Sequence, residues 1–219
     1  MKHILIGLAF CTAALFFSCG DFFTTSLAGW AQRDPSSLIP PVTTGNVAEL
    51  LELTENNPDQ SLALLKGIRD AGANPELQAA ALQAAANASG LGAAIFRHAD
   101  DISNISETDM KGIVIDALRG LDNVVETGSV LEEILPDPSD TAAWNAFVDA
   151  SGAEDLAMAA VVLLAGKARG ENDPGSYIDN FQSTTGSAEK LAKELALAAQ
   201  AKHTGGGFLE DMLNGLHLI

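Results

Sequence analysis

Histidines and neighbouring carboxylates are the side chains of this chain whose types could bind a metal ion or move a proton. His98 lies close to Asp100 and Asp101, but no second histidine stands at the spacing of a metal ligand, so we interpret this cluster as a solvated helix end. Glu132 and Glu133 are adjacent, and adjacent positions point to different sides of a helix. The pattern therefore predicts neither a metal centre nor an acid–base pair.

Three short segments have part of the composition of a ligand-binding loop. Gly166-Lys167 lacks the upstream glycine and the hydroxyl residue of a phosphate-binding loop, and the segment 171–173 lacks the spaced oxygens of a calcium loop. The segment 90–92 lacks the third glycine of a dinucleotide fingerprint and follows a helical pattern, so it predicts a turn between helices. With no nucleophile elbow either, we predict no catalytic residue, no metal site and no cofactor. The chain is expected to be a binding or scaffolding protein rather than an enzyme.

Both cysteines, Cys11 and Cys19, lie in an N-terminal segment with the pattern of an export signal. A basic start at Lys2 precedes the apolar run 4–17, which is the order of regions in a signal peptide. A membrane-spanning helix needs about 20 apolar residues, and Asp21 ends this run early, so a permanent span is the weaker interpretation. In an oxidising compartment an unpaired thiol at Cys19 could form unwanted disulfides, and a lipid attached to its sulfur would prevent this.

The segment Leu15-Phe16-Phe17-Ser18-Cys19 resembles the lipobox of bacterial lipoproteins, and its relaxed form is similar to those of spirochaetes. Phe16 and Phe17 stand where the lipobox prefers leucine and a small residue. The resemblance implies that signal peptidase II removes residues 1–18 and that Cys19 becomes the lipid-bearing first residue. It also implies a membrane lipoprotein that faces the periplasm from the inner or the outer membrane. The alternative is ordinary cleavage after Ala28, which would release a soluble protein starting at Gly29.

The net charge of −17 argues against partners that are bound through a basic surface. Nucleic acid is bound through neutralised phosphates, and anionic lipid through clustered lysine and arginine. The membrane is therefore expected as a partner only through the lipid anchor. Prolines and small polar residues in 19–45 predict a flexible tether between this anchor and a folded body.

From 46 to 204 the chain predicts an all-α domain. Apolar residues recur at three- and four-residue spacing in a series of segments, and no convincing period of two is present. One such stripe is Ala188, Leu191, Ala192, Leu195 and Ala198, with Glu189 and Lys193 placed four apart to form an ion pair. The segment 156–165 is apolar on all sides, which predicts a centrally buried helix.

Four Asn-Pro or Asp-Pro pairs predict helix starts at residues 57, 74, 137 and 173, with two helices between the last two, separated at 151–152. Their spacing indicates helical hairpins, packed either as a TPR-like solenoid or as an irregular helical bundle. The stretch 47–95 is similar to the TPR-like T-component lipoproteins of TRAP transporters, which implies a cleft for a hydrophobic ligand. The first hypothesis is a scaffolding module with a groove for a protein partner; the alternative is a solute- or lipid-binding accessory lipoprotein with an apolar internal channel.

The last segment, 205–219, predicts a glycine hinge followed by a short amphipathic helix. Gly205, Gly206 and Gly207 form the hinge, and Leu213 and Leu216 belong to the apolar face that follows it. This helix is expected to dock onto the body, or to engage a partner as a mobile segment.

Overall fold

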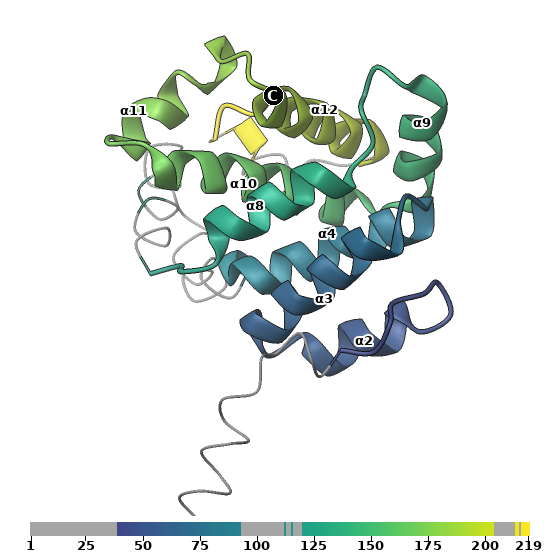
Figure 1. Ribbon diagram of the computed structural model, residues 1–219. Helices are drawn as coiled ribbons and strands as arrows, with labels where there is room; N and C mark the ends of the chain where they lie inside the picture. The colour runs from purple at the N-terminus through teal and green to yellow at the C-terminus, as the bar shows by residue number, and fades with distance from the viewer. Residues whose placement is uncertain (1–38, 93–111, 113–114, 116–119, 204–212, 215) are drawn as a thin grey trace, which may run out of the picture. The chain divides into compact units, whose positions relative to one another are not determined.

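The computed structural model describes residues 39–92, 112, 115, 120–203, 213, 214 and 216–219. The elements of this part of the chain are α2 (Val47–Thr54), α3 (Pro58–Ala71), α4 (Pro75–Ser89), α8 (Val124–Ile134), α9 (Thr141–Ala150), α10 (Ala153–Gly170), α11 (Pro174–Asp179), the short 3-10 helix η2 (Phe181–Ser183) and α12 (Ser187–Lys202) (Figure 1). No strand occurs among the described residues, and the helices pack against one another. The predicted all-α class is confirmed.

Three of the four predicted helix starts are confirmed. Asn57 caps α3 by accepting from the Gln60 amide, Asn74 caps α4, and Asp173 caps α11. In each helix proline occupies the first turn, where its missing N–H leaves no donor unsatisfied.

The predicted start at Asp137-Pro138 is wrong, because α9 begins three residues later. Asp140 is the N-cap of α9 and accepts from the Ala143 amide at 3.2 Å. Asp137 instead closes a turn, since its carboxylate accepts from the Ser139 amide at 2.8 Å and its carbonyl from the Asp140 amide at 2.9 Å. The sequence offers two aspartates that can cap, and the one next to the apolar pattern of α9 does so.

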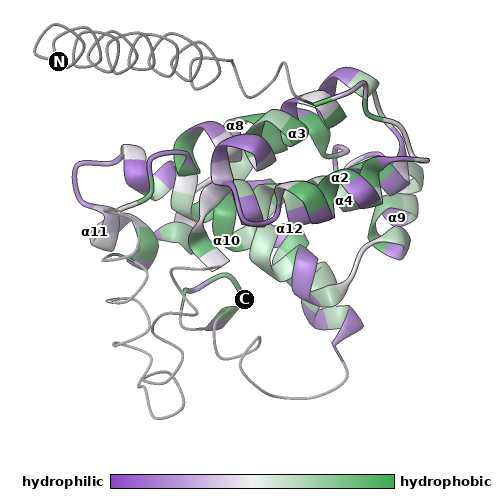
Figure 2. Cartoon of the chain, turned by 90° about the horizontal axis from the view of Figure 1, so that it is seen from below, coloured by the Kyte–Doolittle hydropathy of each residue, from purple (hydrophilic) through white to green (hydrophobic). Residues whose placement is uncertain are grey.

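The helix α10 is the centre of the packing, as the apolar segment 156–165 predicts. Of these ten positions only Met158 is not fully buried. The helices α4, α8, α11 and α12 all contact α10, and α4 also contacts α2, α3, α8 and α9. In a solenoid each repeat contacts only its neighbours, so these contacts are those of the irregular bundle. Figure 2 shows hydrophobic stripes along α3, α4 and α10 with polar residues on the outer turns.

Two glycines let α8 and α10 cross closely. A Cβ on Gly128 would lie 3.6 Å from the Gly166 Cα atom, and one on Gly166 would lie 3.1 Å from the Val124 carbonyl oxygen. A methyl group at Gly166 would therefore press on backbone atoms of α8. Because neither glycine has a side chain, the backbones of α8 and α10 can approach each other closely at this crossing.

The folded body includes residues that the sequence assigned to the tether. Val42 is buried, and a Cβ on Gly67 of α3 would lie 2.8 Å from its Cγ2 atom. The Asn46 side chain accepts from the Thr43 amide at 2.8 Å and donates to the Pro41 carbonyl oxygen at 3.0 Å. The body consequently begins at Ile39, ahead of the predicted boundary at 46, because Val42 offers an apolar side chain to α3.

The described end of the chain is docked. Leu213, Leu216 and Leu218 are buried in the core, and Gln182 donates to the His217 carbonyl oxygen at 2.6 Å. The predicted docking is therefore observed at these positions. The glycine hinge at 205–207 lies outside the described residues.

Candidate functional site

A groove of about 630 Å³, open to solvent, lies between the end of α8 and the beginning of α12. One wall is the last turn of α8 and the loop to α9; the other is the first two turns of α12. We call it the α8–α12 groove. Leu135 and Leu191 form the buried part of its floor, and Pro136 and Pro138 are half-buried beside them. Its remaining lining is polar: Glu132, Asp137, Ser139, Ser187, Lys190 and Glu194.

The wall formed by α12 follows from helical spacing. The apolar stripe of this helix packs on α10, with Leu191 and Leu195 buried, as its spacing predicts. Lys190 and Glu194, four residues apart, occupy neighbouring positions on the edge that borders the groove. Both side chains are exposed, and neither has a hydrogen-bond or ion-pair partner within the described part of the chain.

The opposite wall is held by a buried hydrogen bond and by the turn at 137–140. Gln78 of α4 is buried and donates from Nε2 to the Ile134 carbonyl oxygen at 3.0 Å, which satisfies a carbonyl at the end of α8. Two prolines with fixed φ follow, at 136 and 138. The wall is therefore fixed by covalent geometry and by a contact with α4.

The carboxylates around the groove outnumber its ammonium groups. Glu132 accepts from the Ser187 hydroxyl, which links α8 to α12, and lies 3.4 Å from the Lys167 Nζ atom. Hydrogen bonds from Ser139, first from its backbone amide, hold the pKa of Asp137 below its usual value. Asp137 therefore keeps its negative charge further into the acid range than an ordinary aspartate does. Glu132 is thus paired with Lys167, while Asp137 and Glu194 border the groove together with a single lysine, Lys190.

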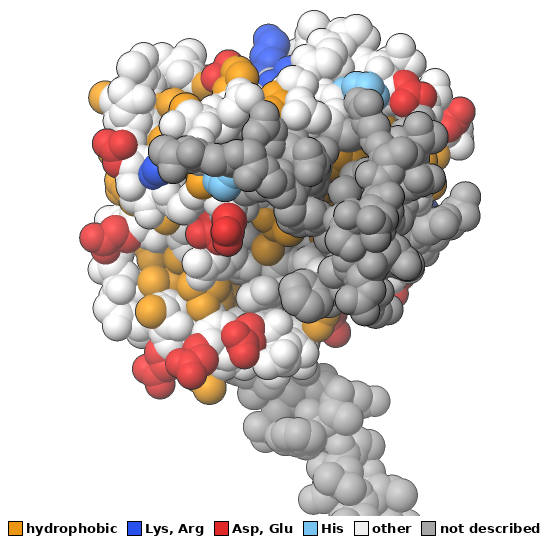
Figure 3. Space-filling model, turned by 180° about the vertical axis from the view of Figure 1, so that it is seen from behind, with side chains coloured by type: hydrophobic (Ala, Val, Ile, Leu, Met, Phe, Trp, Pro, Cys, Tyr) orange, Lys and Arg blue, Asp and Glu red, His pale blue; other side chains and the backbone are white. Residues whose placement is uncertain are grey.

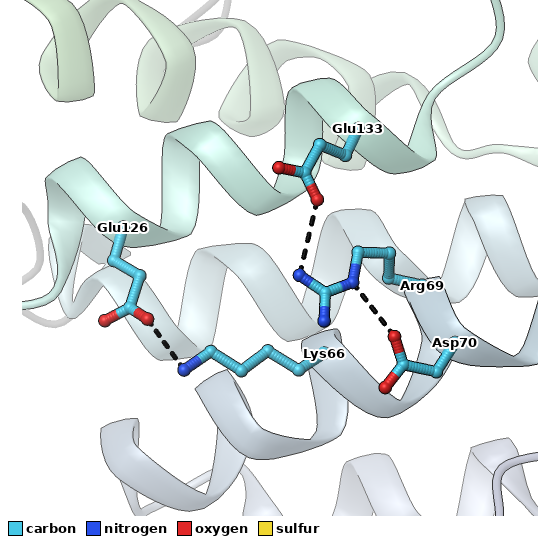
Figure 4. A network of polar contacts seen from close by, with 5 residues as sticks. All are labelled: Lys66, Arg69, Asp70, Glu126 and Glu133. Carbon is cyan, nitrogen blue, oxygen red and sulfur yellow. Dashed lines mark hydrogen bonds and ion pairs between the residues drawn. The ribbon is translucent and has the colours of Figure 1, made fainter.

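Glu132 and Glu133 diverge, as their adjacent positions predict. Glu133 lies 3.3 Å from the Arg69 guanidinium, on the side of α8 that faces α3 (Figure 4). Arg69 also pairs with Asp70 at 3.0 Å, and this hydrogen bond is the main reason that the pKa of Arg69 is raised. These are exposed ion pairs, which contribute little to stability, and they align α8 with α3 rather than form a reactive site.

Glu189 and Lys193 do not form the predicted ion pair in the described structure. The Tyr177 hydroxyl donates to Glu189 at 2.7 Å, and burial, followed by this hydrogen bond, raises the pKa of the tyrosine. Lys193 donates to the carbonyl oxygens of Gln182 and Thr184 at 2.9 and 2.7 Å. Tertiary partners have replaced the local pair, so both side chains hold the α11–η2 segment against α12.

The remaining sequence predictions divide between described and undescribed residues. Gly90 ends α4 with φ of +67°, so the predicted turn lies at this residue, while Leu91 and Gly92 are helical. Cys19 and the cluster of His98, Asp100 and Asp101 lie outside the described residues. Across the described ranges no group of histidine, cysteine, aspartate and glutamate side chains is placed to hold a metal ion. None of the helices in those ranges is both long enough and apolar enough to cross a membrane.

Sequence reasoning missed the α8–α12 groove, because its walls come from segments that are about 50 residues apart in the chain. The one signal in the sequence is the pair of prolines at 136 and 138, of which Pro138 belongs to the predicted helix start at Asp137. Comparisons with family models, with curated proteins and with solved structures found no match to this chain.

Proposed function

We propose that this protein is a lipid-anchored, periplasm-facing interaction module of the bacterial envelope and that it binds a protein partner through the α8–α12 groove. The observation that carries the proposal is the groove itself: it is open to solvent, it has an apolar floor, and charged side chains surround it. Pockets that bind ligands have this composition, mainly apolar with a few polar groups that set orientation. The Gln78–Ile134 hydrogen bond and two prolines restrain one wall, which lowers the conformational entropy that the groove would lose on binding.

The anchor rests on the sequence at the N-terminus. A basic start, the apolar run 4–17 and Cys19 after Ser18 together favour export and lipidation. Two or more acyl chains on Cys19 would give stable membrane attachment, which a single chain does not. Residues between the anchor and Ile39 would then tether the body to the membrane.

The alternative function, a solute- or lipid-binding accessory lipoprotein of a TRAP-type transport system, requires an apolar cavity for its ligand. The described core around α10 consists mainly of buried leucine, valine and alanine side chains. The α8–α12 groove has charged groups along its edge, and a purely hydrophobic ligand would desolvate them without replacing their hydrogen bonds. These two observations favour a protein partner over a hydrophobic small molecule.

The anchor is tested by intact mass of the full chain, extracted from the membranes of a lipidating host, beside a Cys19→Ser variant. We expect a mature species that starts at Cys19 and carries acyl mass, and we expect the variant to lack that mass. An unmodified species starting near Gly29 would refute the anchor.

The partner is tested by site-specific photo-crosslinking in the same membranes. A photo-reactive amino acid replaces Ser139, an exposed residue of the groove, and in a control chain it replaces Glu52, an exposed residue of α2. We expect a discrete adduct with another protein from position 139 and none from position 52. Equal crosslinking from both positions would show that the groove has no special role.

A further inference from the structure

The α8–α12 groove combines an apolar floor with an excess of negative charge. Three carboxylates, from Glu132, Asp137 and Glu194, border a floor that includes two leucines, and of the three Glu132 lies within ion-pair distance of a lysine, Lys167. We infer that the groove binds a segment of the partner protein in which lysine or arginine stands next to aliphatic side chains. This inference rests on the proposed function and names the chemistry of the partner.

The groove is large enough to hold several side chains of a bound segment. Its volume of about 630 Å³ falls within the range of about 300–1,000 Å³ that is usual for ligand pockets. The two leucines are almost fully buried, so the accessible floor consists mainly of Pro136, Pro138 and the aliphatic parts of the longer side chains. Aliphatic groups of a bound segment would cover this floor.

An exposed leucine continues the same edge of α12 beyond the groove. Leu197 stands three residues after Glu194 and seven after Lys190, which places all three on one side of the helix. Its side chain is 49% exposed, one of the few large apolar side chains of the described body that the fold leaves uncovered. A segment that leaves the groove along α12 would cover Leu197, so this residue marks the direction of the bound chain.

The charges identify the partner as cationic. Glu194 has no partner within the described ranges, and the Asp137 carboxylate is kept ionised by the Ser139 amide. A lysine or arginine from the partner would pair with Asp137 and Glu194, while an acidic segment would meet these two carboxylates and a single lysine. The Lys190 ammonium group at the edge of the groove would donate a hydrogen bond to one carboxylate or backbone carbonyl oxygen of the bound segment.

A second copy of this chain fits the groove poorly. The chain has 29 acidic residues against 12 basic ones, so two copies repel each other at neutral pH. Acidic side chains are spread over the described part of the face seen in Figure 3, and basic ones are sparse there. The observations therefore favour a different protein, one that supplies the positive charge.

The test selects binders from a displayed library of random dodecapeptides, using the full chain purified from the membrane. We expect enrichment of peptides that place lysine or arginine beside leucine, isoleucine or valine. The most enriched peptide is then labelled with a fluorophore and titrated by anisotropy against the unchanged protein and three variants. All three change exposed side chains, and circular dichroism checks that each variant is folded.

Charge reversal at Glu194 and removal of the exposed leucine should both weaken binding. We expect Glu194→Lys to raise the Kd about 3- to 10-fold, because an exposed attractive pair becomes a repulsive one. We expect Leu197→Ser to raise it about 3- to 10-fold through lost apolar contact. The matched control Glu52→Lys makes the same change of net charge on α2 and should alter the Kd less than about 2-fold.

Several outcomes would overturn the inference. Enrichment of acidic or uncharged peptides, or no enrichment at all, contradicts the proposed partner chemistry. An effect of Glu52→Lys as large as that of Glu194→Lys means that only the net charge acts. Sedimentation that reveals a dimer disrupted by Glu194→Lys means that a second copy occupies the groove.

These failures are distinguishable from failure of the proposed function. A crosslink from position 139 to a partner segment without basic residues would leave the interaction module standing and refute its cationic partner. Binding of basic peptides by a chain that lacks acyl mass would retain the groove inference and refute the membrane anchor.

Discussion

Replacing Gly166 with alanine should destabilise the protein even though alanine is the better helix former. Gly166 lies inside α10, where a change from glycine to alanine ordinarily stabilises a helix by about 1 kcal/mol. The new Cβ would lie 3.1 Å from the Val124 carbonyl oxygen, which is closer than ordinary van der Waals contact. Because the neighbouring atom is backbone at the start of α8, relief requires movement of that helix.

The size of the effect follows from a matched glycine on the opposite helix. A Cβ on Gly128 would lie 3.6 Å from the nearest atoms, an ordinary contact, so Gly128→Ala should keep most of the propensity gain. Overpacking typically costs about 1–3 kcal/mol. Since both glycines are inside helices, the propensity gain cancels in the comparison. We therefore expect Gly166→Ala to be less stable than Gly128→Ala by about 2 kcal/mol, or about 4–8 °C in Tm.

The assay is thermal and urea unfolding of the full chain, followed by far-ultraviolet circular dichroism, which reports the helix content. Gly170→Ala is the control within α10, because nothing lies within 4 Å of its added methyl group. It should change the free energy of unfolding by less than about 0.5–1 kcal/mol. If Gly166→Ala proves as stable as Gly128→Ala, then the close crossing of α8 and α10 is not what the glycines provide, and the reasoning is refuted.

Two further predictions concern helix starts. Asp140→Ala should lower the free energy of unfolding by about 1 kcal/mol in urea titrations, since it removes the cap of α9; no loss would mean that the cap of α9 contributes nothing. Burial is the main reason that the pKa of Asp155 is raised above its ordinary 3.8, although Gln83 donates to it. Because the native state holds this proton more tightly than the unfolded state, the stability contribution is complete below about pH 3.8 and is lost as the pH rises through the folded-state pKa. Urea unfolding should therefore show that, as the pH rises, the free energy of unfolding of the unchanged protein falls relative to that of Asp155→Asn. A difference between the two proteins that does not depend on pH would contradict the assignment.

Local patterns predicted individual helices well where the signal lay within one segment. The Asn-Pro pairs at 57 and 74 placed two helix starts, because an N-cap needs only the side chain and the amides that follow it. The apolar run 156–165 identified the central helix, because a helix that is hydrophobic on all sides has to be surrounded by others.

Local patterns failed where two segments offered the same side chain different partners. Glu189 and Lys193 stand at the spacing of an ion pair, yet the Tyr177 hydroxyl and the carbonyl oxygens of Gln182 and Thr184 bind them. Asp137 has the chemistry of a helix cap and closes a turn instead. Glu189 and Lys193 take their partners from the packing of α11 and η2 on α12, whereas the Asp137 turn is closed by the nearby Ser139 amide.

The sequence by itself determined the all-α class, the buried α10 and the acidic character of the surface, since composition and periodicity act on each segment separately. Only the tertiary structure decided which helices surround α10 and that α8 ends beside the start of α12. The α8–α12 groove exists because Leu135 and Leu191 both pack into one core, which brings Asp137 and Glu194 to the same opening. No periodicity encodes that meeting, because it depends on how distant surfaces fit together.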